Sequence, residues 1–194
     1  MMLTQLSTVK SRLGIDPTDI KDDELLTRMI EAMSERFDDE CNRRFAREVD
    51  TNEEFRGCDT EIVVQRYPVE SISHFELKTD ETEGWIVQQM PRFMLRRQCV
   101  ISIERPFSAY GGVGKLVYTG GYVLPGDTVG VDQVRLPIEV ETAVVEMVAF
   151  WYQNRDRVGV LKEWPKGGIY QEFADIDLIP SARAVLTKYS RWRV

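Results

Sequence analysis

The spacing of apolar residues changes twice along this chain, and the change limits the folds open to it. From about residue 22 to residue 44, apolar side chains recur at helical spacing, which predicts a long amphipathic helix. From about residue 55 to residue 120, apolar and polar residues alternate, which is the spacing of β-strands. Helical spacing returns after Pro137. The fold class that we predict is therefore α+β, with a β-rich insertion between helical ends.

The helical ends are expected to form one small bundle that carries the insertion. Residues 1–54 would supply the N-terminal helices, residues 55–121 the β-rich insertion, and residues 122–194 two C-terminal helices of the same bundle. A chain of 194 residues is long enough to build one good core with a sizeable insertion.

Capping and stop signals define the expected helices more closely. A short helix spans residues 4–13, where Thr4 can cap it and Gly14 can stop it. The long helix follows over residues 22–44. Pro137 opens a third helix whose apolar residues cover a broad arc, so we expect contacts on several of its sides. Pro180 opens the last helix.

Turn residues divide the β-rich insertion into five expected strands. These strands span residues 61–66, 71–78, 85–90, 99–104 and 115–119. Two long loops are expected outside the insertion, over residues 122–136 and 160–179. Loops of that length without regular structure are uncommon in compact domains, and they often have a function or form an interface.

The sequence GGVGK at residues 111–115 looks at first like a phosphate-binding loop. Such a loop needs G-x-x-x-x-G-K followed by Ser or Thr, between a strand and a helix. Ala109 stands where the first glycine should be, and Leu116 stands where the hydroxyl should be. The residues that follow favour a strand rather than a helix. We therefore expect no nucleotide cofactor here, and instead a mobile connection formed by Gly111, Gly112 and Gly114.

No residue set points to a catalytic or metal site. The cysteines, Cys41, Cys58 and Cys99, have no zinc-binding spacing, and the single His74 lies in a strand-like run. Three acidic residues at positions 22–24 suit the positive end of a helix dipole better than a metal ion. We predict no metal, no cofactor and no enzymatic activity. A small cytosolic enzyme with an acidic cleft stays open as an alternative, because 32 acidic residues allow many carboxylate pairs.

The net charge of −7 argues against a protein that grips nucleic acid through its phosphates. A DNA-binding module is therefore the weaker alternative. The chain starts without the apolar core of a signal peptide, and no apolar run reaches the ~18 residues that span a bilayer. We expect synthesis in the cytoplasm and no membrane partner.

Five stretches, in this order, resemble phage head–tail connector proteins, the adaptor or head-completion family. They are DDELLTRMIEAMSERFDDECNRRF, YPVESI, LVYTGGY, LPIEVETAVVEMVAFWYQNRD and IPSARAVLTKYSRW. The order of the stretches is more specific than any one of them. Residues 73–115 are longer than the hairpin of compact family members, so the resemblance does not say what the insertion does.

The resemblance implies a non-enzymatic structural protein of the virion neck, at the portal vertex. Copies of the chain would form a homo-oligomeric ring below the portal protein, with dodecameric symmetry to match it. The ring would extend the channel, let genomic DNA pass without sequence-specific binding, and offer a platform to the tail or to a stopper (neck) protein. The alternative within this class is a tail-side completion or terminator protein.

Two groups of residues are expected to contact partners. The portal-facing group is the C-terminal end, where a tryptophan lies between arginines: Lys188, Tyr189, Arg191, Trp192 and Arg193. The simpler alternative is that Trp192 docks on the chain's own core. The second group lies in loops that would face a neighbouring copy or the tail: Gly111, Gly112, Gly114, Trp164 and Lys166.

Overall fold

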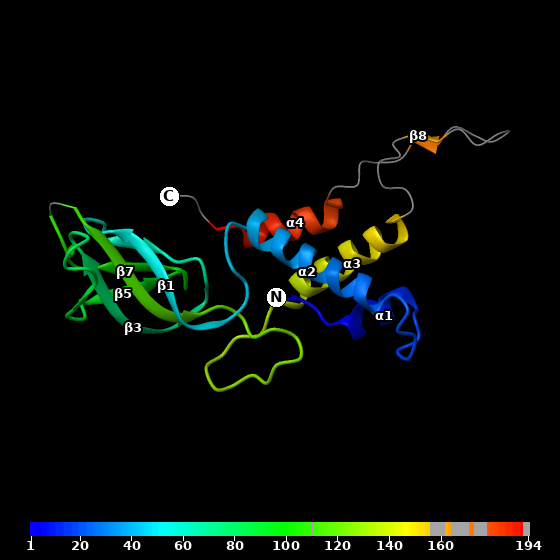
Figure 1. Ribbon diagram of the computed structural model, residues 1–194, viewed down its shortest axis with the longest axis horizontal. Coiled ribbons are helices and arrows are strands. Elements are labelled where there is room, and N and C mark those ends of the chain that lie inside the picture. Colours follow the sequence, from blue (N-terminus) through cyan, green and yellow to red (C-terminus); the bar gives the residue numbers. More distant parts are fainter. Residues whose placement is uncertain (110, 156–161, 164–170, 173–177, 192–194) are drawn as a thin grey trace. The chain divides into compact units, whose positions relative to one another are not determined.

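The structure is a computed structural model that describes the chain except for residues 110, 156–161, 164–170, 173–177 and 192–194 (Figure 1). The chain divides into two compact units. The helical unit consists of Met1–Cys41 and Pro137–Ser190, and the β unit consists of Asn42–Leu136 together with Arg191. The described residues therefore have the mixed helix and strand content, with antiparallel sheets, of an α+β protein.

The helical unit is organised around α3. Its described residues form four helices: α1 (Leu6–Leu13), α2 (Asp23–Glu40), α3 (Ile138–Gln153) and α4 (Pro180–Tyr189). The α3 helix contacts each of the other three, as the broad apolar arc of its sequence predicts (Figure 1). Val140, Val144 and Met147 on α3 are fully buried, and so are Leu26, Ile30, Met33 and Phe37 on α2.

Two helix ends differ from the sequence prediction. The α2 helix ends at Glu40 rather than at residue 44, because Asn42 adopts a positive φ of 48° and turns the chain into the β unit. Thr4 does not cap α1: the N-cap residue is Gln5, and the Thr4 hydroxyl donates to Glu141 on α3 at 3.3 Å. Gly14 ends α1 in the left-handed conformation, as predicted.

The segment between α3 and α4 is not the irregular loop that was expected for residues 160–179. Within it, β8 (Lys162–Glu163) pairs antiparallel with β9 (Gln171–Glu172). The expected contact residues Trp164 and Lys166 lie outside the described residues.

The β unit contains two antiparallel sheets among its described residues. The first has the strand order β1-β7-β3-β4, and the second has the order β2-β6-β5. The strands are β1 (Glu48–Arg56), β2 (Glu61–Val63), β3 (Val69–Lys78), β4 (Ile86–Gln88), β5 (Phe93–Arg96), β6 (Val100–Ile103) and β7 (Val113–Gly120). The five expected strands all appear with shifted ends, whereas β1 and β5 were not predicted.

Both sheets contribute to one apolar core in the β unit. Strands β3 and β7 supply Phe75, Leu116 and Tyr118, and the second sheet supplies residues such as Ile62 and Ile101. All five side chains are 2% exposed or less. This core fixes which residues of each strand face outward, and those outward residues are the ones available to partners.

The β unit is wider than the predicted insertion of residues 55–121. It begins at Asn42 because β1 belongs to it, and it extends to Leu136 because backbone bonds hold the following loop to it. Tyr122, at the start of that loop, donates to the carbonyl of Phe45 at 2.8 Å. The loop is then closed by Val123, which donates to the carbonyl of Val134 at 2.9 Å, and by Leu136, which donates to that of Val123 at 3.0 Å. The helical parts are correspondingly shorter than residues 1–54 and 122–194.

Arg43 lies in a cage of aromatic rings near the start of the β unit. Its side chain is 2% exposed, and its guanidinium carbon lies 3.4 Å from the centroid of the Tyr67 ring and 4.5 Å from that of Phe45. The ring of Tyr122 lies on the same guanidinium, at 5.2 Å. The guanidinium also donates to the Tyr67 carbonyl. A flat cation that stacks and donates at once suits arginine and not lysine.

Candidate functional site

The C-terminal helix uses two of the predicted partner-binding residues inside the helical unit. Lys188 and Tyr189 both reach the carboxylate of Glu139, which lies in the first turn of α3. The hydrogen bond from Lys188, followed by that from Tyr189, holds the pKa of Glu139 below its ordinary value. These two side chains therefore attach α4 to α3.

Arg191 is also engaged within the chain. Its guanidinium donates to the carbonyl of Val63 and lies 3.6 Å from a carboxylate oxygen of Glu53. Burial raises the pKa of Glu53, while the Gln65 amide that donates to it and the charge of Arg191 oppose that shift. The side chains of Arg191 and Glu53 are only 16% and 11% exposed, so this ion pair is largely shielded from water. Trp192 and Arg193 lie outside the described residues.

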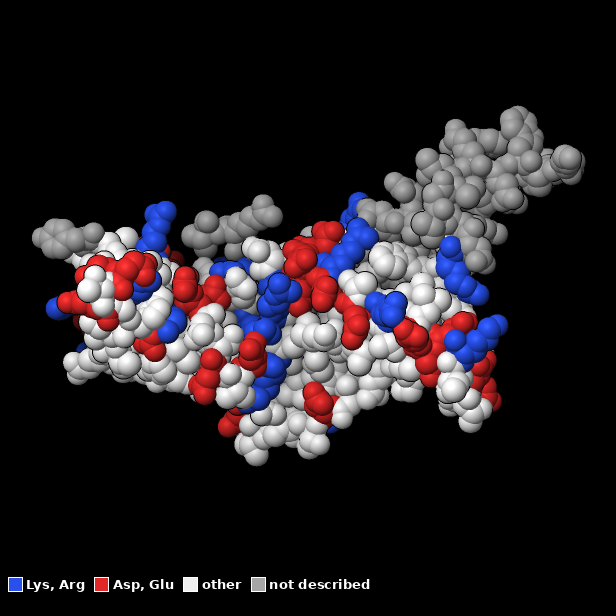
Figure 2. Space-filling view, in the orientation of Figure 1, with Lys and Arg blue, Asp and Glu red and all other residues white. Residues whose placement is uncertain are grey.

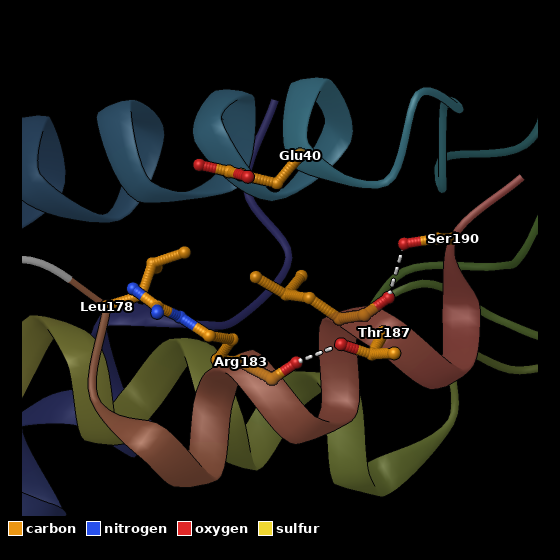
Figure 3. Close-up of a pocket in the computed structure, with 6 residues that line it drawn as sticks. Glu40, Leu178, Arg183, Thr187 and Ser190 are labelled. Carbon is orange, nitrogen blue, oxygen red and sulfur yellow. Dashed lines mark hydrogen bonds between the residues drawn. The ribbon is translucent and has the colours of Figure 1, made fainter.

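A groove of about 360 Å³ lies in the helical unit between the end of α2 and α4 (Figure 3). Its lining residues are Glu40, Leu178, Arg183, Leu186, Thr187 and Ser190. The hydroxyls of Thr187 and Ser190 donate to backbone carbonyls one turn earlier in α4, at 2.9 and 2.8 Å (Figure 3). Both hydroxyls are therefore used by the helix itself, and the groove has no group placed as a nucleophile with a base beside it.

The three predicted loop glycines have different roles. Gly111 and Gly112 have φ values of 112° and 93°, which L side chains rarely adopt, and they lead into β7. Gly114 instead lies inside β7, where it was expected in the connection. It is required by packing, because a Cβ at this position would come within 2.3 Å of the Phe55 ring. The strand after these glycines agrees with the rejection of a phosphate loop.

The β unit exposes apolar side chains that the sequence did not single out. They lie immediately before β4, on β4, on β5 and between these strands: Trp85, Ile86, Val87, Met90, Phe93, Met94 and Leu95. Met94 is 68% exposed and Val87 is 65% exposed. Exposed apolar residues that follow each other so closely in a chain are typical of contact surfaces. Four of these residues lie in the strand expected over residues 85–90, whereas strand β5 (FMLR) has no alternation of apolar and polar residues that would reveal it in the sequence.

The described parts of the chain hold no candidate metal site. No group of three or more His, Cys, Asp or Glu residues that could hold a metal ion occurs there. The ring Nε2 of His74 lies 3.0 Å from Oε1 of the Glu76 carboxylate, which is a structural contact. Burial raises the pKa of the Cys99 thiol, which lowers its reactivity.

Charges of both signs are mixed over the visible surface. In Figure 2, Lys and Arg side chains lie among Asp and Glu side chains on the face that is shown, over both units. Such a face does not resemble the basic stripe of a protein that holds DNA by its phosphates. None of the described helices combines the length and the apolar character needed to cross a membrane.

Comparison with known families confirms the resemblance to head–tail connector proteins over the N-terminal part of the chain. Residues 3–78 match the family of phage gp6-like head-tail connector proteins. The matched stretch runs from the residues before α1 to the last residue of β3. No curated protein matches the chain significantly.

Two solved structures share the fold over nearly the whole chain. The "Neck of empty GTA particle computed with C6 symmetry" aligns with a TM-score of 0.61 and 13% identity, over 97% of this chain and 90% of that one. The "Virion of native gene transfer agent (GTA) particle" aligns with a TM-score of 0.58 and 14% identity, over the same shares. At these identities the likeness shows the fold alone. The family is described as head-tail connector proteins, and the two structures are described as a particle neck and a virion, which agrees with the prediction of a non-enzymatic structural protein.

Proposed function

We propose that this chain is a structural protein of the virion neck, a head–tail connector whose copies form a ring below the portal. The observation that carries the proposal is the agreement between two independent comparisons. The family match covers residues 3–78, and the fold likeness to a particle neck covers 97% of the chain. The ring would extend the DNA channel and present a platform to the tail or to a further neck protein.

The ring is proposed to contain twelve copies, as a match to the portal. The similar neck was computed with sixfold symmetry, and twelve copies are compatible with sixfold symmetry. A closed ring uses a head-to-tail contact, in which two different surfaces of each copy meet. We propose that the helices of the helical unit act as one rigid bundle in this ring.

The portal contact is proposed to lie at the C-terminal end, in the last three residues, 192–194. Lys188, Tyr189 and Arg191 make contacts inside the chain, so deleting all of residues 188–194 would disturb the fold as well as any partner. Deleting only residues 192–194 keeps those contacts. This shorter deletion is expected to leave the thermal unfolding midpoint unchanged and to abolish portal binding.

Electron microscopy of the purified chain with its portal protein tests the function. The expected image is a ring of connector density below the portal. The absence of both self-association and portal binding would overturn the proposal. Capture of the chain by a purified tail tube and not by the portal would instead support a tail-side completion or terminator protein.

The channel role has its own test. A protein whose channel lets DNA pass should retain duplex DNA weakly at physiological salt. Tight retention with a steep salt dependence would indicate many phosphate contacts and would support a DNA-binding module instead.

A further inference from the structure

We propose that neighbouring copies join edge to edge through their β units, with β5 of one copy pairing against β1 of the next. This inference rests on the proposed ring, and it names the two surfaces that close the ring. The pairing adds backbone hydrogen bonds between copies and continues the sheets from one copy into the next.

Both strands have an open edge. Among the described strands, β1 and β5 each end a sheet and pair on one side only. An open edge presents unpaired backbone N–H and C=O groups that form a template for another chain, and soluble proteins usually protect it. The residues of β5 are exposed throughout, and three of the four are apolar: Phe93, Met94 and Leu95, at 41%, 68% and 41%. A partner strand would cover them.

The charges of the two edges are opposite. Strand β1, with the sequence EVDTNEEFR, carries four carboxylates and one arginine. The segment around β5, RFMLRR at residues 92–97, carries three arginines and no carboxylate. Some of these charges are used within the chain: Glu48 pairs with Arg66, Glu53 pairs with Arg191, and Arg96 pairs with Glu61. Exposed Glu54 and Arg92 lie outside those pairs, so each edge keeps its sign.

Opposite signs decide which edges meet. Two β5 edges together would oppose arginines, and two β1 edges together would oppose carboxylates, and like charges directly opposite each other destabilise a strand pair. The edge of β4 is apolar but uncharged, so it gives no preference for an acidic partner. A contact between β1 and β5 joins two different surfaces, which is what a closed ring requires.

A charge-exchange experiment tests the contact on the full chain. The first variant, Arg92→Glu with Met94→Glu, makes residues 92–94 of the β5 edge acidic and leaves Arg96 and Arg97 in place. The second variant, Asn52→Lys with Glu54→Lys, makes residues 52–54 in the middle of the β1 edge basic and leaves Glu48 and Asp50 in place. Asn52, Glu54, Arg92 and Met94 are all exposed. Each variant alone should raise the concentration for half-assembly about tenfold or more, because like charges now meet.

An equal mixture of the two variants should recover ring assembly. In the mixture, the acidic β5 edge of one variant meets the basic β1 edge of the other. The unchanged β1 edge of the first variant also meets the unchanged β5 edge of the second. Mass photometry of the wild type, each variant and the mixture measures this directly. Thermal unfolding midpoints close to that of the wild type show that the substitutions act on assembly and not on folding.

The control variant is Val87→Glu on β4, an equally exposed apolar edge residue of the same unit. It should assemble as the wild type does. Disruption by Val87→Glu with normal assembly of both exchange variants would overturn the β1–β5 contact and point to β4. The β1–β5 contact would also be overturned if the two exchange variants stay folded but form no ring, either alone or in the mixture. A wild type that forms no ring, alone or on the portal, would count against the proposed function itself.

Discussion

Gly114 on β7 lies directly beneath the ring of Phe55 on β1. A Cβ at position 114 would lie 2.3 Å from Cζ of Phe55 and 2.4 Å from Cε2. The ring cannot easily retreat, because it packs against Phe75 and Phe107 with centroid distances of 6.4 and 6.1 Å. A glycine that looked like part of a flexible connection is therefore a fixed requirement of the first sheet.

Gly114→Ala is expected to lower the free energy of unfolding by about 1–3 kcal/mol, as overpacking does. The backbone at Gly114 accepts alanine, so the whole cost comes from the clash. Urea denaturation measures it. In a Phe55→Leu background the same substitution should cost clearly less, and an equal cost in both backgrounds would contradict this explanation.

Arg43→Lys is expected to destabilise the chain by about 1–2 kcal/mol, although it keeps the charge. Lysine cannot stack flat between the rings of Tyr67 and Phe45 while donating to the Tyr67 carbonyl. Thermal and urea unfolding measure the loss. Arg105→Lys is the matched control, because Arg105 is an exposed arginine of the same unit, and it should change stability much less.

Arg191→Met is expected to cost about 1–3 kcal/mol, because it leaves the largely buried carboxylate of Glu53 without its cation. Glu53→Gln in the same chain should restore part of the loss, since a neutral amide needs no cation. A double-mutant cycle from urea denaturation measures the coupling. Simple addition of the two single effects would show that the pair is not coupled.

The stability of the β unit should depend on pH through Glu76. The hydrogen bond from Lys115, with a smaller contribution from His74, lowers the pKa of Glu76 below its ordinary value of 4.5. The stabilisation is therefore complete above pH 4.5 and is lost as the pH falls through the lowered pKa. Glu76→Gln should be less stable than the wild type at pH 7, and the difference should shrink toward zero in acid.

Glu53→Gln is the opposite case and serves as the control for that experiment. Burial raises the pKa of Glu53, so its contribution is favourable below its ordinary pKa of 4.5 and is lost as the pH rises through the raised pKa. The wild type should therefore lose stability relative to Glu53→Gln as the pH rises. Urea denaturation at several pH values distinguishes the two signs.

Apolar spacing was enough to predict the helices and the five regular strands, because their buried residues recur with a fixed period. The strands that were missed lack that signal. In β1 the sequence EVDTNEEFR is dominated by acidic residues, and in β5 the sequence FMLR is exposed on both faces. Both are edge strands, where a partner can contribute as much to the choice of residues as the core does.

The sequence indicates which residue types at the C-terminal end can form contacts, but it does not show whether they contact a partner or the chain itself. A tryptophan between arginines indicates an anchor, yet sequence cannot show that Tyr189 and Lys188 reach Glu139 or that Arg191 reaches Glu53. These contacts join residues about fifty or more positions apart, and only the folded chain brings them together. Polar residues at helical spacing look the same whether they face water, a partner or their own chain.

The division of the helical unit between residues 1–41 and 137–190 has a consequence for synthesis. A chain that emerges from the ribosome delivers α1 and α2 first, and their apolar faces have no α3 to pack on until residue 137 appears. The β unit, residues 42–136, is complete in sequence before that point and can fold as a unit. Its folding brings the flanking segments nearer together, which reduces the entropy cost of closing so long a loop. The helices of the helical unit are therefore expected to be the last part of the chain to gain protection from hydrogen exchange.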